Sequence, residues 1–305
     1  MGRRRKGLPI SGWLNFHKPI GMTSTQAVGK ARWLLGAQKA GHGGTLDPLA
    51  SGVLPIAFGE ATKVLPFLVH DRKAYRFEVT WGRSTTTDDL EGETLETSDA
   101  RPMPADLSEA LKSFVGTIEQ TPPAFSAIKV NGKRAYALAR AGETVALKSR
   151  PVEIHALKIV SCQAHSALID VRCGKGTYIR SLARDLAKQL GTQGHVTRLE
   201  RCRVGPFALQ DAISLEKLES SRHKPGLLLA LETVLDDIPA LAVSGEAAQK
   251  IKHGQAIEID EQCDGDVLLT VDGYALALAQ VTGILAQPRR VFHLSSNDMN
   301  HEGDS

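Results

Sequence analysis

The stretch YRFEVTW, residues 75–81, alternates apolar and polar side chains along its whole length. Its apolar members fall on one face: Tyr75, Phe77, Val79 and Trp81. A period of two with one polar face predicts a half-buried strand of an antiparallel sheet. The stretch ALIDVRC, residues 167–173, alternates in the same way and predicts a second strand of this kind.

Two helices are predicted around these strands. The stretch TYIRSLARDLAKQLG, residues 177–191, places its apolar side chains on one helical stripe, and Gly191 suits the C-cap. Its basic side chains, Arg180, Arg184 and Lys188, fall on another face. A second helix is predicted over residues 24–35, because Thr23 and Gln26 have the spacing of a capping box.

Strands and helices do not alternate with a regular βαβ period, so the pattern predicts an α+β fold with a mixed, largely antiparallel sheet and helices around it. This larger domain is predicted over residues 1–238. Within it, residues 116–150 contain a Pro pair, an Asn-Gly and a short basic helix predicted at 133–140. They indicate an excursion from the core, of the kind that often carries function.

The sequence pattern changes after about residue 238. Short strands such as DVLLTVD (266–272) and ALALAQV (275–281) are separated by Gly and Asp turns. A small β-rich domain is therefore predicted over residues 239–295. The last ten residues, 296–305, have the composition of a flexible tail.

The charge of the chain is unevenly distributed. The 305 residues are 42% hydrophobic and 23% charged, typical of a soluble globular protein, with a net charge of only +3. Residues 171–205 nevertheless hold eight Arg or Lys against two acids, a surplus of six. Such a cluster attracts polyanions, and a phosphate backbone is the usual one. A solvated basic face is the alternative reading.

The cysteines and the N-terminus exclude several classes of protein. Four cysteines without CxxC spacing or a nearby His pair argue against a zinc site and a disulfide framework. No apolar run approaches 18 residues, and the basic N-terminus lacks the apolar stretch of a signal peptide. A cytoplasmic protein without a membrane segment is expected.

Several catalytic motifs are absent. The glycine-rich GKGT at residues 174–177 does not complete a P-loop, although a turn before a helix N-terminus suits a phosphate or carboxylate. Neither HExxH nor GxSxG occurs, and the neighbourhood of Asp47 offers no second carboxylate for a glycosidase pair.

Asp47 is the strongest single candidate for chemistry. It is the only acid between residues 2 and 57 and lies in HGGTLDPLASGVLP, residues 42–55. Pro48 favours an extended backbone at Asp47, which helps to fix the direction of the carboxylate. The following VLPIAFG, residues 53–59, has the composition of a buried strand. From these residues alone, a turn-capping acid and a catalytic acid are equally good readings.

Six ordered segments resemble motifs of the tRNA pseudouridine synthases of the TruB class, which isomerise uridine 55 in the tRNA T arm. They are FHKPIGMTS (16–24), GHGGTLDPLASGVLPIAFGEATK (41–63), KAYRFEVTWG (73–82), KVNGKRAYALARAG (129–142), CGKGTYIRSLARDL (173–186) and HVTRLERCRVGPF (195–207). Two positions depart from the usual pattern, His17 and Thr86, where the family often has Asp. Neither lies in the motif around Asp47.

The resemblance implies three catalytic residues. Asp47 is the nucleophile that attacks the target nucleotide, after which the uracil detaches from C1′, rotates and rejoins through C5. Tyr75 stacks on the uracil and assists the late proton removal, and Arg180 pairs with Asp47. A neighbouring guanidinium favours the ionised carboxylate that such a nucleophile needs. No cofactor, metal or ATP is implied.

The resemblance also implies residues that bind the RNA. An enzyme that acts on a base inside a folded loop must extrude it and fill the gap, and His42 is expected to fill that gap. Residues expected to contact the substrate are Lys18, His42, Gly43, Gly44, Tyr75, Tyr178 and Leu199. Residues expected to hold phosphates are Lys129, Lys133, Arg140, Lys175 and Arg184.

The partner implied is the T arm of tRNA, without guide RNA, and a monomer is expected. The small domain at 239–295 is similar to a reduced PUA-like RNA-binding domain. Two other functions stay open at this point: a tRNA-folding chaperone, and a guide-RNA-dependent relative that modifies ribosomal RNA. The basic excursion at 116–150, which such relatives lack, favours direct tRNA recognition. Whether attack occurs at C1′ or C6, or whether a glycal forms, is also open.

Overall fold

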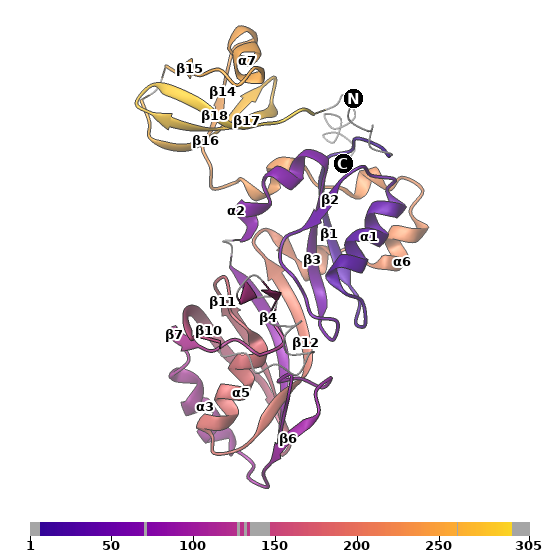
Figure 1. Cartoon of the computed structure of the whole chain (residues 1–305), viewed down its shortest axis with the longest axis vertical. Helices are drawn as coiled ribbons and strands as arrows, with labels where there is room; N and C mark the ends of the chain where they lie inside the picture. Colours follow the sequence, from indigo (N-terminus) through magenta and orange to yellow (C-terminus); the bar gives the residue numbers. More distant parts are fainter. Residues whose placement is uncertain are drawn as a thin grey trace.

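The structure is a computed structural model that describes residues 7–69, 72–126, 129–130, 133–134, 147–260 and 262–294. A large sheet flanked by helices forms the N-terminal body, and a smaller, mainly β body follows it at the C-terminal end of the chain (Figure 1). The α+β class expected from the sequence is confirmed.

The central sheet is mixed and largely antiparallel. Its strands lie in the order β1 (Gly12–Lys18), β3 (Ser51–Phe58), β12 (Gly194–Val204), β4 (Lys73–Trp81), β11 (Ser166–Cys173), β10 (Arg150–Cys162) and β7 (Gly116–Gln120). Two short strands extend it, β2 (Ala40–His42) beside β3 and β13 (Phe207–Ala208) beside β12. Only the pair β3–β12 is parallel among the described strands of this sheet.

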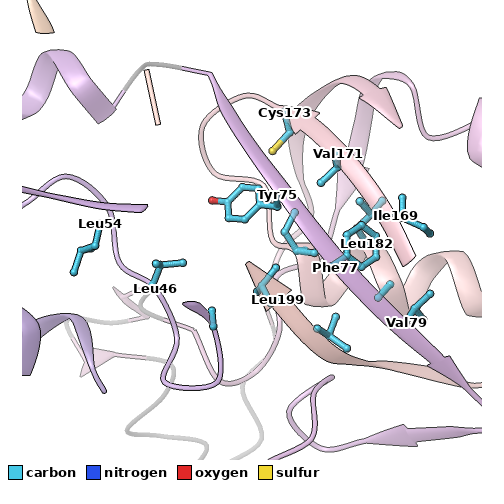
Figure 2. Packing of buried hydrophobic residues seen from close by; sticks show 14 of the residues in the cluster. Leu46, Leu54, Tyr75, Phe77, Val79, Ile169, Val171, Cys173, Leu182 and Leu199 are labelled. Carbon is cyan, nitrogen blue, oxygen red and sulfur yellow. The ribbon is translucent and has the colours of Figure 1, made fainter. Parts of the chain in front are cut away.

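The alternation in YRFEVTW produces the strand at the centre of this sheet. β4 pairs with β12 on one side and β11 on the other, and its apolar face is buried as predicted. The side chains of Phe77, Val79 and Ile169 pack against Leu182 of the helix α5 (Ile179–Gln189; Figure 2). Both predicted strands, residues 75–81 and 167–173, are confirmed.

Both predicted helices form with the expected ends. α1 spans Ser24–Leu34 and has the capping box between Thr23 and Gln26. α5 spans Ile179–Gln189, and Gly191 follows it with a φ of 69°, a left-handed conformation that favours glycine. The other helices are α2 (Leu65–Val69), α3 (Pro104–Lys112), α6 (Leu215–Ser220) and the 3₁₀ turns η1 (Gly59–Lys63), η2 (Leu209–Asp211), η3 (Pro225–Leu227) and η4 (Leu231–Val234).

The excursion from the core is shorter than the 116–150 expected. Residues 116–120 form β7, an edge strand of the central sheet that pairs with β10 from Arg150 onward. The segment between the two strands is therefore 121–149. Lys133–Arg134 forms the short strand β9, paired with β8 (Lys129–Val130), so a helix does not begin at Lys133. The rest of that predicted helix, 135–140, lies outside the described residues. A further hairpin joins β5 (Arg83–Thr85) and β6 (Thr94–Thr97).

The C-terminal body is a five-stranded sheet with one helix. Its elements are β14 (Ala240–Ala242), α7 (Gly245–Lys252), β15 (Ile257–Glu258), β16 (Gly265–Val271), β17 (Tyr274–Thr282) and β18 (Leu285–Val291). An apolar cluster that contains Trp13 and Leu68 of the first body and Leu278 and Phe292 of the second joins the two. The Lys63 ammonium also donates to the Val291 carbonyl at 2.7 Å.

Candidate active site

Asp47 lies in a loop between β2 and β3 that is fixed to the start of α1. The backbone N–H of Leu46 donates to the Ser24 hydroxyl at 2.8 Å, and that hydroxyl donates to the Leu46 carbonyl at 3.0 Å. Gly21 N–H donates to the Pro48 carbonyl at 2.8 Å. The residues on both sides of Asp47 are therefore tied to a separate part of the chain, which fixes the direction of its carboxylate.

A buried guanidinium holds the same loop from the sheet side. Arg201 on β12 is 1% exposed. It donates to the carbonyls of Val53 (2.7 Å), Gly44 (3.0 Å) and Thr45 (3.4 Å). An arginine presents its donors in a rigid planar fork, so this single side chain fixes both the loop before Asp47 and the strand after it.

Arg180, the first arginine of α5, binds the Asp47 carboxylate. Its Nη2 lies 2.9 Å from Asp47 Oδ2, and its Nη1 lies 3.3 Å from Oδ2 of the buried Asp89. The guanidinium also donates to the carbonyls of Thr87 (2.8 Å) and Phe125 (2.9 Å). Arg180 is 5% exposed and Asp47 is 37% exposed. The guanidinium is thus a buried anchor, whereas the carboxylate remains accessible.

The accessible side of Asp47 opens into a cavity of about 280 Å³. The cavity is lined by Gly44, Thr45, Leu46, Asp47, Lys73, Tyr75, Ser126, Arg150, Gly176, Thr177, Tyr178, Ile179, Arg180, Leu199 and Arg201. Figure 2 shows the Tyr75 ring projecting from β4 toward the loop that carries Leu46, with Leu199 nearby on the next strand. One carboxylate therefore faces an aromatic ring and an apolar wall.

The Tyr75 phenol is protonated at neutral pH. Burial raises its pKa, and the nearby Arg201 guanidinium opposes this rise only in part. A neutral phenol next to a carboxylate can donate or relay a proton without adding a second negative charge to the cavity.

Tyr178 immediately precedes α5 and is held by a buried amide. The Gln120 side chain accepts from the Tyr178 N–H at 2.8 Å and donates to its carbonyl at 3.1 Å. The Arg150 guanidinium carbon lies 5.3 Å from the centre of the Tyr178 ring, within the range of a cation–π contact. Strands β7 and β10 thus determine where this ring meets the cavity.

Lys18 does not line this cavity. Its side chain is fully buried, and its ammonium donates to the carbonyls of Pro19 (2.8 Å) and Met22 (2.7 Å). Burial lowers the pKa of Lys18 to about 8, although the nearby Asp47 acts in the opposite direction. Two carbonyls of the protein accept from the ammonium, so this position gives no support to the expected substrate contact, which stays a prediction.

The stability of the protein should rise with pH because of Lys18. Between a folded pKa of about 8 and the ordinary value of 10.5, the folded protein releases a proton that the unfolded chain keeps. The unfolding free energy of the wild type minus that of Lys18→Met should therefore increase by about 1.5 kcal/mol from about pH 8 to 9.5. Urea denaturation at several pH values measures this, and a constant or falling difference would contradict the burial argument.

Packing and backbone conformation within the protein explain the two glycines before Asp47. A Cβ on Gly43 would lie 2.3 Å from the Leu68 side chain of α2, so Gly43 permits close packing there. Gly44 has a φ of 108°, a backbone conformation that residues with a side chain rarely adopt. His42, at the end of β2, is half-buried and lies outside the cavity lining. Burial lowers the pKa of His42, which favours the neutral ring.

The residues expected to hold phosphates differ in their exposure and in their partners within the protein. Arg184 is paired with Asp88 and Asp185, both at 2.9 Å, and donates to the Thr121 carbonyl. Lys175 is exposed in the turn before α5. Lys129 and Lys133 belong to a short hairpin, but their side chains, like the whole of Arg140, lie outside the described residues.

Three residues of the site do not follow from the sequence pattern: Asp89, Gln120 and Arg201. Arg201 belongs to the basic cluster that was expected to attract polyanions, yet it is buried. One signal was available, because Leu199 and Arg201 are two residues apart on a strand and therefore share a face. His195 is buried, and its ring contacts the Arg83 carbonyl at 3.1 Å.

The described residues offer neither a membrane-spanning helix nor a group of metal ligands. None of the helices in these ranges has the length and apolar character required to cross a bilayer. Within the same ranges, His, Cys, Asp and Glu side chains do not gather in a group of three or more that could hold a metal ion.

A single accessible carboxylate, anchored by a buried arginine and facing a tyrosine across an apolar cavity, is the arrangement expected of a pseudouridine synthase. Two family models match the chain: TruB family pseudouridylate synthase (N-terminal domain) over residues 32–179, and tRNA pseudouridylate synthase B C-terminal domain over residues 180–238. The chain belongs to the TruB family of pseudouridylate synthases and is therefore an isomerase.

Relatives and solved structures agree with this assignment. The chain is 54% identical to tRNA pseudouridine synthase B of Caulobacter sp. (strain K31), with 84% of each chain covered. It is 49% identical to tRNA pseudouridine synthase B of Bradyrhizobium diazoefficiens, with 96% of this chain and 88% of the relative covered.

Among solved structures, a chain of a Cbf5-Nop10-Gar1 complex is similar with a TM-score of 0.71 and 25% identity, over 92% of this chain and 85% of that one. A chain of an H/ACA RNP bound to a substrate RNA gives a TM-score of 0.72 at 22% identity, with 97% and 93% covered, and this shows the shared fold.

Proposed function

We propose that this pseudouridine synthase acts on tRNA, that its target is uridine 55 in the T arm, and that it needs no guide RNA or cofactor. The observation that carries the chemistry is the Asp47 carboxylate, which is held by the buried Arg180 and accessible from a cavity shared with Tyr75 and Leu199. The tRNA substrate is supported by the names of the relatives at 54% and 49% identity.

In the proposed reaction, the uridine leaves the RNA stack and its base enters the cavity. Extrusion is required because Asp47 lines a cavity that a base inside an RNA stack cannot enter. Asp47 attacks the nucleotide, the uracil detaches from C1′, turns, and rejoins the ribose through C5. As the C5–C1′ bond forms, the bond between Asp47 and the nucleotide breaks and the carboxylate is regenerated. The proton on C5 is then lost to water or the carboxylate and N1 gains one, with the Tyr75 phenol, which lines the same cavity, as the proposed relay.

Arg180 has a second carboxylate partner, and this matters for the proposed covalent step. When Asp47 bonds to the nucleotide, it loses its negative charge. Asp89 lies 3.3 Å from the same guanidinium and keeps the buried positive charge compensated. The site can therefore pass between ionised and covalently bonded Asp47 without leaving Arg180 unpaired.

We infer that RNA contacts arise mainly outside the cavity. His42 borders the Asp47 loop and is the proposed residue that fills the space of the extruded base. The excursion at 121–149, with Lys129, Lys133 and Arg140, together with the exposed Lys175, is the proposed phosphate-binding part. Lys18 is buried and bonded to carbonyls of the protein, so it is not part of this proposal, and Arg184 would contact a phosphate only after its bonds to Asp88 and Asp185 break.

An isolated T-arm stem-loop tests the function directly. The pure protein should convert the single uridine at position 55 to pseudouridine, because the proposed recognition needs no other RNA or protein. A stem-loop with cytidine at this position is the matched control and should stay unmodified. Mass-shift labelling of pseudouridine measures both. An inactive protein that becomes active only when a second RNA is added would contradict direct recognition and favour the guide-dependent alternative.

A further inference from the structure

The basic surplus of residues 171–205 separates into two groups in the structure. Arg180, Arg184 and Arg201 are buried or half-buried and bonded to carboxylates and carbonyls of the protein. Arg172 and Arg203, in contrast, are exposed, and within the described residues neither has a carboxylate within ion-pair distance, although Arg203 Nε donates to the Gly205 carbonyl at 2.9 Å. Exposed charge is therefore present at the ends of β11 and β12, in addition to the exposed Lys175, Lys188 and Arg198.

The sheet register brings these two arginines to one place. Arg172 on β11 and Arg203 on β12 both pair with Ala74 on the strand between them. Residues directly opposite one another share a face of the sheet, and neighbouring strands lie about 4.8 Å apart. The two backbones are therefore roughly 10 Å apart, with a small side chain between them. Two long cationic side chains thus lie on either side of the small Ala74 side chain.

A hollow of about 650 Å³ occupies this place. Its lining is Arg72, Lys73, Ala74, His155, Arg172, Arg203, Gly205 and Asp237. Four of these residues are cationic and one is acidic. Two neighbouring guanidinium groups repel each other unless an anion lies between them, and planar guanidinium donors match the oxygens of a phosphate. The chemistry of the hollow is that of a phosphate site.

The position of the hollow connects it with the proposed substrate. Ala74 and Tyr75 are adjacent on β4, so their side chains point to opposite faces of the sheet. Lys73, at the start of the strand, lines both the Asp47 cavity and the hollow. Asp237, on the other side, immediately precedes the C-terminal body that begins at β14. Because Lys73 lines both, an RNA that extends from the cavity toward this body would pass the start of β4.

We propose that Arg172 and Arg203 form a clamp for a backbone phosphate of the substrate RNA, outside the catalytic cavity. This rests on the proposed tRNA substrate. The clamp carries no sequence information, because it contacts the backbone alone. Its role is to fix the path of the RNA between the catalytic sheet and the C-terminal body.

The test compares two double variants that remove the same charge. Arg172→Ala/Arg203→Ala should reduce the slope of log affinity for a full-length tRNA transcript against log salt by about 0.7 for each phosphate that the variant no longer neutralises. From about 50 to 200 mM salt, the wild type should then lose at least about 2.5-fold more affinity than this variant. Lys112→Ala/Lys158→Ala removes two exposed charges from α3 and β10 and should keep the wild-type slope.

Each outcome has one meaning. If the slope of Arg172→Ala/Arg203→Ala equals that of the wild type, the clamp is overturned. If both double variants lose slope equally, the effect is that of net charge, and the clamp is again overturned. If inorganic phosphate raises the melting temperature of the wild type alone while the tRNA slopes agree, the hollow binds free phosphate and not RNA. Absence of tRNA binding by the wild type would instead contradict the proposed function itself.

Discussion

Asp47→Asn is expected to reduce kcat for pseudouridine formation by at least about 10⁴-fold, the scale on which nucleophile replacements act. The amide has the same shape, and its oxygen can still accept from Arg180. It has no negative charge, however, and is a far weaker nucleophile than a carboxylate. Single-turnover conversion of the T-arm stem-loop measures this loss.

The same variant should remain folded and should still bind RNA. Arg180 keeps Asp89 and two carbonyls as partners, so the melting temperature should change little. Glu91→Gln is the matched control: it removes the charge of another acid close enough to interact with Asp47, but one that does not line the cavity. Its turnover should stay within a few-fold of the wild type. Near-normal turnover by Asp47→Asn would contradict the assignment of the nucleophile.

The helices and strands that were predicted correctly are those whose pattern lies within one short stretch of the chain. The alternation in 75–81 and 167–173 and the stripe in 177–191 depend on one strand or helix at a time, and all three elements form as predicted. The excursion was predicted from the Pro pair, the Asn-Gly and the basic stretch within 116–150, and GTIEQ, with Ile118 as its one apolar residue, carries no clear strand pattern of its own. Its membership of the sheet depends on pairing with β10, which is distant in sequence and has no local signal.

The residues that line the candidate site could be predicted from the sequence, but the buried residues that hold them in place could not. The resemblance identified Asp47, Tyr75 and Arg180, which the structure brings together around one cavity. It placed Lys18 among the substrate contacts because the motif around it is shared. Whether a cation in a motif faces solvent, a carboxylate or buried carbonyls is decided by the fold, and a count of charges does not contain this information. Arg201 and Lys18 are both examples.

Arg201→Met should impair both stability and catalysis. Methionine fills a similar space but donates no hydrogen bond, so the carbonyls of Val53, Gly44 and Thr45 lose their donor. Buried acceptors without a partner cost about 1–3 kcal/mol each, although removal of a buried charge offsets part of this loss. We expect the unfolding free energy to fall by about 3 kcal/mol, measured by urea denaturation. Arg198→Met, at an exposed position of the same strand, should change it by less than about 0.5 kcal/mol.

Catalysis gives the sharper test of the role of Arg201. A displacement of about 1 Å in a reacting group can reduce a rate by about 10²-fold. Because the guanidinium fixes the loop before Asp47 and lines the same cavity as Tyr75, kcat should fall by this order even at a temperature where Arg201→Met is fully folded. Arg201→Lys keeps the charge but not the planar fork, so its kcat should fall between the two. A folded Arg201→Met with wild-type kcat would show that the residue supports the fold alone, since a purely structural role predicts a loss of stability and no loss of turnover in the folded enzyme.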